Sequence, residues 1–145
     1  MAEKKSTPKS SKASSEEKKN KYFEGVGRRK TAVARVRFIP TGSGFTVNGL
    51  DFKSYFSNSR FEKSAEAPLK TSGAKGSVEV KARGGGVMAQ SDAVKLGLAR
   101  ALVKFNPDFK KDFRVLGYMT RDSRMVERKK YGLKKARRAP QWRKR

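Results

Sequence analysis

Residues 77–105 read SVEVKARGGGVMAQSDAVKLGLARALVKF and combine two different apolar periods on either side of three glycines. Before the glycines, Val78, Val80 and Ala82 alternate with charged side chains, and this period of two predicts a strand over residues 77–83. After the glycines, apolar side chains recur at helical spacing, at Val94, Leu98, Ala101, Leu102 and Phe105. The segment therefore predicts a strand, a tight turn and a long helix in one α+β domain.

A strand with the same alternation is predicted upstream, over residues 31–39. Its apolar face is formed by Ala32, Ala34, Val36 and Phe38. Proline and glycine end this strand, and a second short strand is predicted at residues 45–47. Asn48-Gly49 then supplies the pair of positive-φ residues that tight turns favour. Together these features predict a hairpin-like start to the domain.

Two short helical turns are predicted between these strands, at residues 51–56 and 60–67. Their expected anchors are Phe52, Phe56 and Phe61, and Pro68 is expected to interrupt the pattern.

One further helix is predicted after residue 105. Asn106 followed by Pro107 is typical of an N-cap with proline at the first helical position. The helix that starts there is expected to present Phe109 and Phe113 to the core.

The composition indicates a protein that works beside a polyanion. Lys and Arg number 37 against 13 Asp and Glu, and the formal net charge is +24, which favours nucleic acid as the partner. An anionic membrane is the rival, but the chain has no run of about twenty apolar residues and no hydrophobic leader. Cys and His are absent, which removes thiol chemistry, the usual general base and the commonest metal ligand. We therefore expect no enzyme, no cofactor, no metal, no small-molecule substrate and no membrane partner.

Charge and apolar content divide the chain into three parts. Residues 1–21 are rich in Ser, Lys and Glu and predict a disordered N-terminal extension. Residues 22–120 hold the periodic patterns of the globular domain. Residues 121–145 carry twelve basic and two acidic side chains without apolar periodicity. They predict an extended tail that becomes ordered when its charges meet phosphates.

Two glycine-containing motifs in the domain are candidate phosphate contacts. Arg28, Arg29 and Lys30 follow Gly27 and suggest a phosphate clamp, although a solvated strand entrance has the same composition. Within Gly84-Gly85-Gly86, the first and third glycines together with Ala89 superficially match the G-x-G-x-x-A dinucleotide fingerprint, but no acidic residue ends a second parallel strand about twenty positions later. The glycines more simply indicate a strand-to-helix turn, or exposed amides that accept an RNA phosphate.

The tail holds two further patterns. At its base, Asp122 and Glu127 lie among cations, and ion pairing with arginines is favoured over a Mg²⁺ site, which would need further ligands. Further along, Tyr131 and Trp142 stand among Lys and Arg, the composition of a segment that stacks on bases.

Four separated motifs, in the same order throughout residues 22–145, closely resemble the bacterial small-subunit ribosomal protein nine family. They are GRRKTAVARV at 27–36, GGG at 84–86 with Gln90, GLARAL at 97–102, and TRD at 120–122 with ERKKYGLKKARRAPQ at 127–141. The resemblance implies a small sheet with helices packed on one face, similar to the second domain of small-subunit ribosomal protein five, with a left-handed β-α-β crossover. It also implies a structural constituent of the small ribosomal subunit, in the cytoplasm.

The family's partners, carried over by position, are small-subunit rRNA in the head, neighbouring ribosomal proteins and the anticodon stem-loop of P-site tRNA. The expected tRNA-binding residues are Arg143, Lys144 and Arg145. The expected rRNA-binding residues are Arg28, Arg29, Lys30, Arg121, Arg124, Arg128, Lys129, Lys130, Lys134, Lys135, Arg137 and Arg138. The chain departs from the family in having Arg143 where Ser is usual, and in a longer N-terminal extension. A free nucleic-acid chaperone or a nucleoid-type DNA-binding protein is the alternative that the same charge pattern allows.

Overall fold

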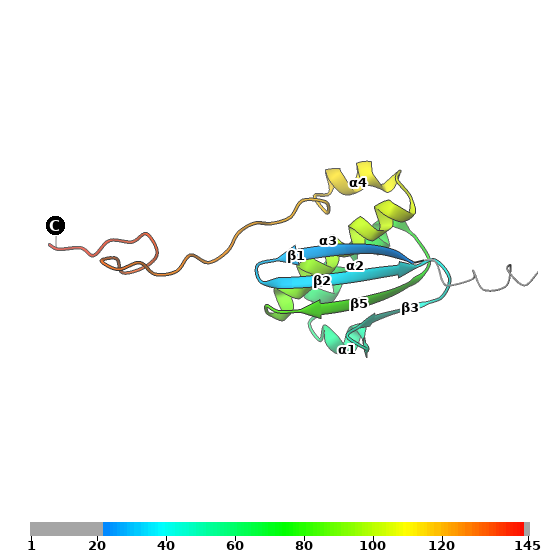
Figure 1. The fold of residues 1–145 in the computed structure, drawn as a ribbon, viewed down its shortest axis with the longest axis horizontal. Helices are drawn as coiled ribbons and strands as arrows, with labels where there is room; N and C mark the ends of the chain where they lie inside the picture. The colour runs from blue at the N-terminus through cyan, green and yellow to red at the C-terminus, as the bar shows by residue number, and fades with distance from the viewer. Residues whose placement is uncertain (1–21, 144–145) are drawn as a thin grey trace, which may run out of the picture.

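A five-stranded mixed sheet, with strand order β1-β2-β5-β3-β4, forms the centre of the domain (Figure 1). Its strands are β1 Phe23–Arg29, β2 Ala32–Ile39, β3 Gly44–Val47, β4 Leu50–Asp51 and β5 Ser77–Arg83. Neighbouring strands are antiparallel except β3 and β5, which are parallel. The structure is a computed structural model that describes residues 22–143. The prediction for residues 1–21 therefore lies outside the described residues, as do Lys144 and Arg145.

The strands predicted at residues 31–39, 45–47 and 77–83 are confirmed as β2, β3 and β5. Strand β1 was not predicted, because Gly25 and Gly27 occupy the inward positions where apolar side chains would have marked an alternation. The prediction that the strands at residues 31–39 and 45–47 form the starting hairpin is wrong: β1 and β2 form that hairpin, and β5 lies between β2 and β3.

The turn predicted at Asn48-Gly49 is confirmed and joins β3 to β4. Asn48 has φ 51° and Gly49 has φ 82°, the left-handed backbone that such a turn requires. The Asn48 side chain also bonds β5: its Nδ2 donates to the Ala82 carbonyl at 3.0 Å, and its Oδ1 accepts from the Ala82 N–H at 2.9 Å. One side chain thus both permits the turn and extends the pairing of β5.

The connection from β3 to β5 contains α1 Phe52–Tyr55 and α2 Ser59–Ser72. β3 and β5 run in the same direction with the helices behind the sheet, which makes this crossover left-handed (Figure 1). The prediction that Pro68 interrupts the helix is wrong. Pro68 lies inside α2 and is fully buried, and burial of its ring offsets the one backbone hydrogen bond that it cannot make.

The long helix predicted after the glycines is confirmed as α3 Val87–Phe105. Within residues 22–143, no helix is both long and apolar enough to cross a membrane. The next helix, α4 Phe109–Val115, begins later than predicted, and its N-cap is Asp108. Asn106 instead ends α3, and its Oδ1 accepts from the Asp108 N–H at 3.1 Å. Asn106 therefore lies in the turn between α3 and α4, and it is not the N-cap of α4 as predicted.

Helix α3 lies very close to β1 because both surfaces lack large side chains. A Cβ built at Gly27 would lie 1.8 Å from the Ala93 carbonyl oxygen, and one at Gly25 would lie 2.1 Å from the Gly97 oxygen. A Cβ built at Gly97 would in turn lie 2.8 Å from the Val36 side chain and 3.1 Å from the Gly27 nitrogen. This approach sets the position of Arg29 at the end of β1 relative to α3.

The helices cover one face of the sheet, and the other face is open to solvent (Figure 1). On the covered face, the predicted inward residues Ala32, Ala34, Val36 and Phe38 are all buried, and so are the β5 residues Val78, Val80 and Ala82. Phe105 departs from the predicted helix stripe: its side chain is 40% exposed and packs edge to face on Phe23 and Phe38.

Strand β1 forms one edge of the sheet, and side chains from α3 bond its outward carbonyls. Arg100 donates to the Val26 carbonyl at 2.6 Å, and Lys104 Nζ donates to the Glu24 carbonyl at 2.7 Å. Two helix cations are thus used to satisfy the backbone of an edge strand. The opposite edge, β4, is only two residues long.

Candidate nucleic-acid interface

The three cations of the predicted clamp do not point in one direction. Successive side chains of a strand alternate between the two faces of a sheet, so Arg28 stands on the open face and Arg29 turns toward α3. Lys30 lies in the β1–β2 turn with φ 50°. Arg28 and Lys30 are exposed, whereas the Arg29 side chain is only 11% exposed.

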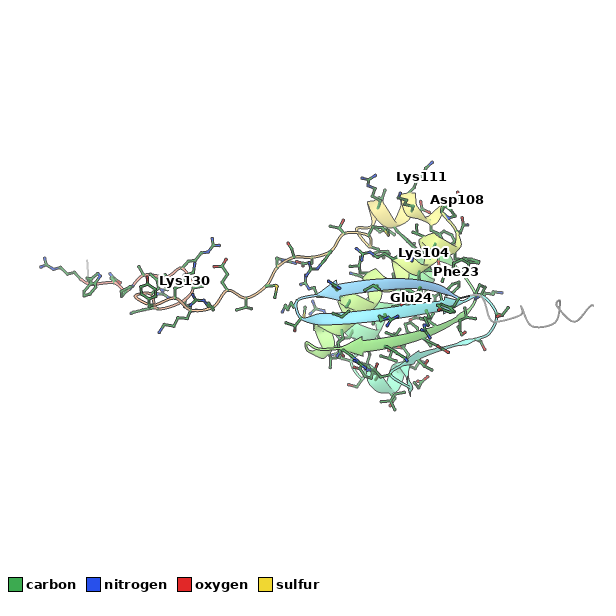
Figure 2. All side chains as sticks on the ribbon, viewed as in Figure 1. Phe23, Glu24, Lys104, Asp108, Lys111 and Lys130 are labelled. Carbon is green, nitrogen blue, oxygen red and sulfur yellow. The ribbon has the colours of Figure 1, made fainter. Side chains whose placement is uncertain are left out.

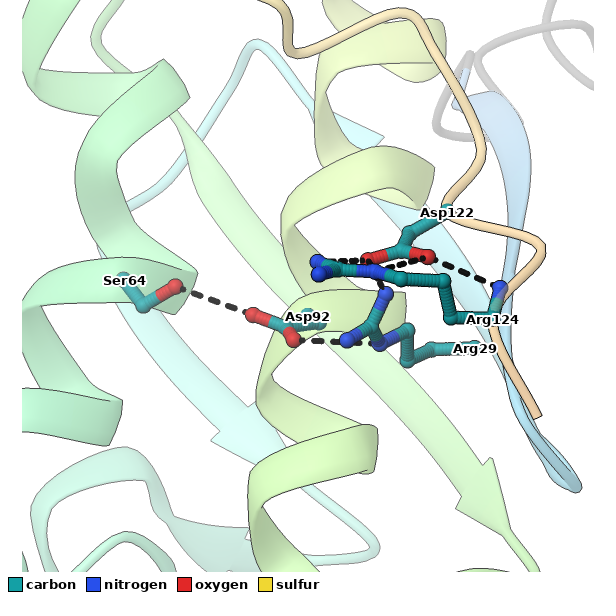
Figure 3. Close-up of polar contacts among 5 residues, drawn as sticks. All are labelled: Arg29, Ser64, Asp92, Asp122 and Arg124. Atoms are coloured by element: carbon teal, nitrogen blue, oxygen red, sulfur yellow. Dashed lines mark hydrogen bonds and ion pairs between the residues drawn. The ribbon is translucent and has the colours of Figure 1, made fainter. Parts of the chain in front are cut away.

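Arg29 is held by carboxylates from two other segments, as Figure 3 shows. Its Nε lies 3.5 Å from Asp92 of α3, and its Nη1 pairs with Asp122 at the start of the tail. Asp92 also accepts a long hydrogen bond of 3.4 Å from Ser64 of α2. The arginine therefore links the first strand, the central helix and the tail.

The Asp122 carboxylate also binds Arg124, which confirms the predicted pairing at the base of the tail. Arg124 approaches both carboxylate oxygens, with distances of 2.6–3.1 Å, and the Arg124 N–H donates to Oδ1 at 2.9 Å. A cleft of about 360 Å³ opens beside this network. Its charged lining residues are Arg28, Arg29, Arg60, Lys95, Arg124, Asp92 and Asp122, so cations outnumber acids there.

The glycine turn lies directly against the β1–β2 turn. Gly84 has φ 71° and Gly85 has φ 64°, and a Cβ at Gly84 would lie 2.7 Å from the Thr31 carbonyl oxygen. Gly86 has φ −98° and is the N-cap of α3, with no side chain to cap the helix. Gln90 donates to the Gly84 carbonyl at 3.2 Å and accepts from the Tyr55 hydroxyl at 2.6 Å. Gly84 and Gly85 thus provide the positive φ angles that this turn requires. The turn lies beside the exposed Arg28 and Lys30.

Residues 121–143 contain no helix or strand and extend away from the domain (Figure 1). Lys130 and the side chains near it stand clear of the sheet and helices (Figure 2). Tyr131 is 97% exposed and Trp142 is 91% exposed. The predicted rRNA-binding cations of this segment are all exposed: Arg121, Arg124, Arg128, Lys129, Lys130, Lys134, Lys135, Arg137 and Arg138.

One local structure interrupts the extended tail. The Lys134 N–H donates to the Arg138 carbonyl at 2.7 Å, and Arg137 forms a two-point contact with Glu127 at 2.5 and 2.9 Å. The hydrogen bond to Glu127 raises the pKa of Arg137 above its usual value. The predicted role of Glu127 as an arginine partner is confirmed, and the loop leaves the neighbouring cations pointing outward.

Three exposed cations on the open face of the sheet were not named as site residues from the sequence: Arg35, Lys81 and Arg83. Their alternation marked them as outward-facing, but only the pairing of β2 with β5 brings them together.

The exposed cations of the domain and the acid-poor, aromatic-bearing tail define this chain as a nucleic-acid-binding protein with a flat basic surface and a linear arm. The model of the family described as ribosomal protein S9/S16 matches residues 27–145. This chain belongs to that family. It is therefore a ribosomal protein with a structural role in translation, and not an enzyme.

Curated relatives cover most of the chain. A small ribosomal subunit protein uS9 of Thermus thermophilus is 51% identical over 125 residues, which is 85% of this chain and 98% of the relative. The protein of the same name from Cytophaga hutchinsonii is 52% identical over 126 residues, covering 85% of this chain and 98% of the relative. A third, from Nostoc punctiforme, is 51% identical and covers 85% of this chain and 91% of the relative.

Proposed function

We propose that this chain is a structural constituent of the small ribosomal subunit that binds small-subunit rRNA and reaches P-site tRNA with its C-terminal end. In this proposal residues 22–120 dock on rRNA in the head of the subunit, beside neighbouring ribosomal proteins in the cytoplasm. Residues 121–145 then follow RNA backbone toward the anticodon stem-loop of the tRNA.

The observation that carries this proposal is the exposure of the tail. From residue 128 onward the chain has ten basic and no acidic side chains, and the described part of that stretch makes no contact that would bury Tyr131 or Trp142. Such a segment has no core of its own, so phosphate contacts and base stacking are the interactions that would fix it. Arginine suits the end of the tail because its planar guanidinium binds a phosphate through two hydrogen bonds.

The ion pairs at the base of the tail support the proposal that the domain and the tail have different roles in RNA binding. Asp122 holds Arg29 and Arg124, so the direction in which the tail leaves the domain is set before RNA binds. Beyond this point, Arg137 pairs with Glu127, and the other tail cations that the structure describes have no acidic partner. Phosphate contacts carry no sequence information, so a polybasic segment alone would bind RNA without selecting a site. In this proposal the domain supplies the positioning and the tail supplies the electrostatic attraction.

The proposal is tested by removing residues 143–145 and measuring retention of P-site tRNA by purified small subunits. We expect tRNA retention to fall while assembly of the subunits is largely unchanged. The matched control is a full-length variant in which the exposed Lys53, Lys63 and Lys75 are changed to Gln, which removes the same number of cations from helix surfaces and a loop. Equal tRNA affinity in the deleted, control and unmodified subunits would remove the proposed role of the tail.

A second experiment separates this function from a free nucleic-acid chaperone or nucleoid protein. A ribosomal constituent should stay with small subunits in sedimentation through a moderate salt wash, whereas a free chaperone should remain in the soluble fraction.

A further inference from the structure

A basic patch lies on the open face of the sheet, at the end nearest the β1–β2 turn. It consists of Arg28 of β1, Arg35 of β2, and Lys81 and Arg83 of β5, around the half-buried Val33. Strand register brings these residues together: Val33 lies between Arg28 and Arg83, and Arg35 lies directly opposite Lys81. The patch is therefore a product of strand pairing and cannot be seen in any one segment of the sequence.

The charges of the basic patch are not balanced within the protein. Arg35 pairs with Glu24 at 2.9 Å, but in the part of the chain that the structure describes, no acid lies within ion-pair distance of Arg28, Lys81 or Arg83. Like charges placed directly opposite each other on neighbouring strands are destabilising. Glu24 offsets part of the repulsion between Arg35 and Lys81, and a bound anion would relieve the rest.

The other end of the same face has a different charge pattern. There the cross-strand row is Glu24, Arg37 and Glu79, in which the sign alternates from strand to strand. A surface that serves only solubility would mix both signs throughout. The separation of charge along one face therefore favours a polyanion bound at the basic end.

The shape of the basic patch suits an extended, flat partner. Val33, Arg35, Lys81 and Arg83 line a shallow depression of about 250 Å³. Outward side chains two residues apart on a strand are separated by about 7 Å, and strands two apart by about 10 Å. The cations thus surround an apolar floor over an area that a sugar and its flanking phosphates can cover.

We infer that the basic patch binds the sugar–phosphate backbone of RNA and forms a second contact surface beside the tail. The inference rests on the proposed function, since it takes RNA as the polyanion. Arg28 joins the two surfaces: it belongs to the patch, it lines the cleft at the root of the tail, and it precedes Arg29, which holds Asp122. RNA bound along the tail therefore has a continuous cationic path onto the sheet.

The test is the salt dependence of binding between the full chain and small-subunit rRNA. The test variant is Lys81→Gln with Arg83→Gln, and the control is Lys53→Gln with Lys63→Gln, which removes the same charge from exposed positions on α1 and α2. Each phosphate contact contributes about 0.7–0.9 to the slope of log affinity against log salt. We expect the test variant to lower the magnitude of the slope by roughly 1.5 and the control to leave it unchanged. Equal slopes for the two variants would overturn the inference.

Two further measurements guard against a folding defect. Removing Lys81 relieves the like-charge pair, so the test variant should melt at the same or a higher temperature while it binds RNA less well. In the unmodified chain, an amine-reactive reagent should label Lys81 less when RNA is bound, with Lys53 labelled equally in both states. Equal labelling of Lys81 with and without RNA would also overturn the inference. Failure of the unmodified chain to bind rRNA at all would instead count against the proposed function.

Discussion

Arg29 at the end of β1 and Asp122 at the start of the tail form an ion pair that joins the first strand to the segment that leaves the domain. The Arg29 side chain is 11% exposed and that of Asp122 is 29% exposed, so water screens this contact only in part. The carboxylate also binds Arg124, and one acidic side chain thus organises the point where the folded domain ends.

Replacing Asp122 with Asn should loosen this point. Arg29 would keep only the longer contact to Asp92, and we expect a loss of about 1–2 kcal/mol in the free energy of unfolding, measured by urea denaturation. Trypsin should also cleave faster after Arg121 and Arg124. The control is Glu127→Gln, which breaks a well-exposed ion pair with Arg137 and should leave unfolding unchanged. Equal stability of the two variants would contradict the role of Asp122.

Replacing Gly27 with Ala should be among the most damaging single changes in the domain. The added Cβ would collide with backbone atoms of α3, at 1.8 Å from the Ala93 oxygen and 2.6 Å from the Gly97 nitrogen. Because backbone cannot move aside as a side chain does, we expect a loss of about 3 kcal/mol or more in thermal or urea unfolding. Gly86→Ser is the contrasting change: nothing lies near its Cβ, and a serine N-cap should preserve or raise stability.

The two functions of Asn48 can be separated by a pair of variants. Asn48→Gly keeps the backbone freedom but loses both hydrogen bonds to Ala82, whereas Asn48→Ala also strains the turn. We expect a loss of about 1–3 kcal/mol for the glycine variant and a further loss for alanine, both from denaturation curves. If the alanine variant is as stable as the glycine variant, the positive φ at Asn48 does not contribute to the free energy of unfolding.

The tail should account for much of the salt sensitivity of RNA binding. If about five of its cations contact single-stranded phosphates, deleting residues 128–145 should lower the magnitude of the log–log salt slope by roughly 3.5. The measurement is affinity for small-subunit rRNA over a salt series. A slope that survives the deletion would assign the phosphate contacts to the domain instead.

Trp142 provides a direct optical probe of the tail, because it is the only tryptophan in the chain. Its side chain is 91% exposed in the free protein, and stacking on a base should quench its fluorescence. Trp142→Ala should weaken RNA binding by about 1–3 kcal/mol if one base stacks there. Unchanged emission on saturation with RNA would place Trp142 outside the contact.

Strict alternation and strict helical spacing made β2, β5 and α3 predictable from the sequence. Strand β1 escaped prediction because its glycines meet α3, a contact between segments about seventy residues apart. The prediction that Pro68 interrupts a helix failed for a related reason. The burial of Pro68 depends on how the whole domain packs and not on its neighbours in sequence. Local patterns predict an element best where its buried face is made of apolar side chains.

The candidate site also has one part that could be predicted from the sequence and one part that could not. The chemistry of the tail follows from composition, because a run of cations without acids needs no partner segment to be recognised. The opposite orientations of Arg28 and Arg29, the network around Asp122 and the basic patch all depend on which strand lies beside which. Their residues were visible in the sequence as charged or outward-facing, but their proximity was not.

The hydrogen bonds from Arg100 and Lys104 to the carbonyls of β1 affect how the free chain behaves before it binds RNA. A bare outer strand is a template on which a second copy can add its own strand, and this is a common start of aggregation. Here two long side chains occupy those acceptors, and the short β4 offers little at the other side. Newly made copies are in this way kept from joining into extended intermolecular sheets.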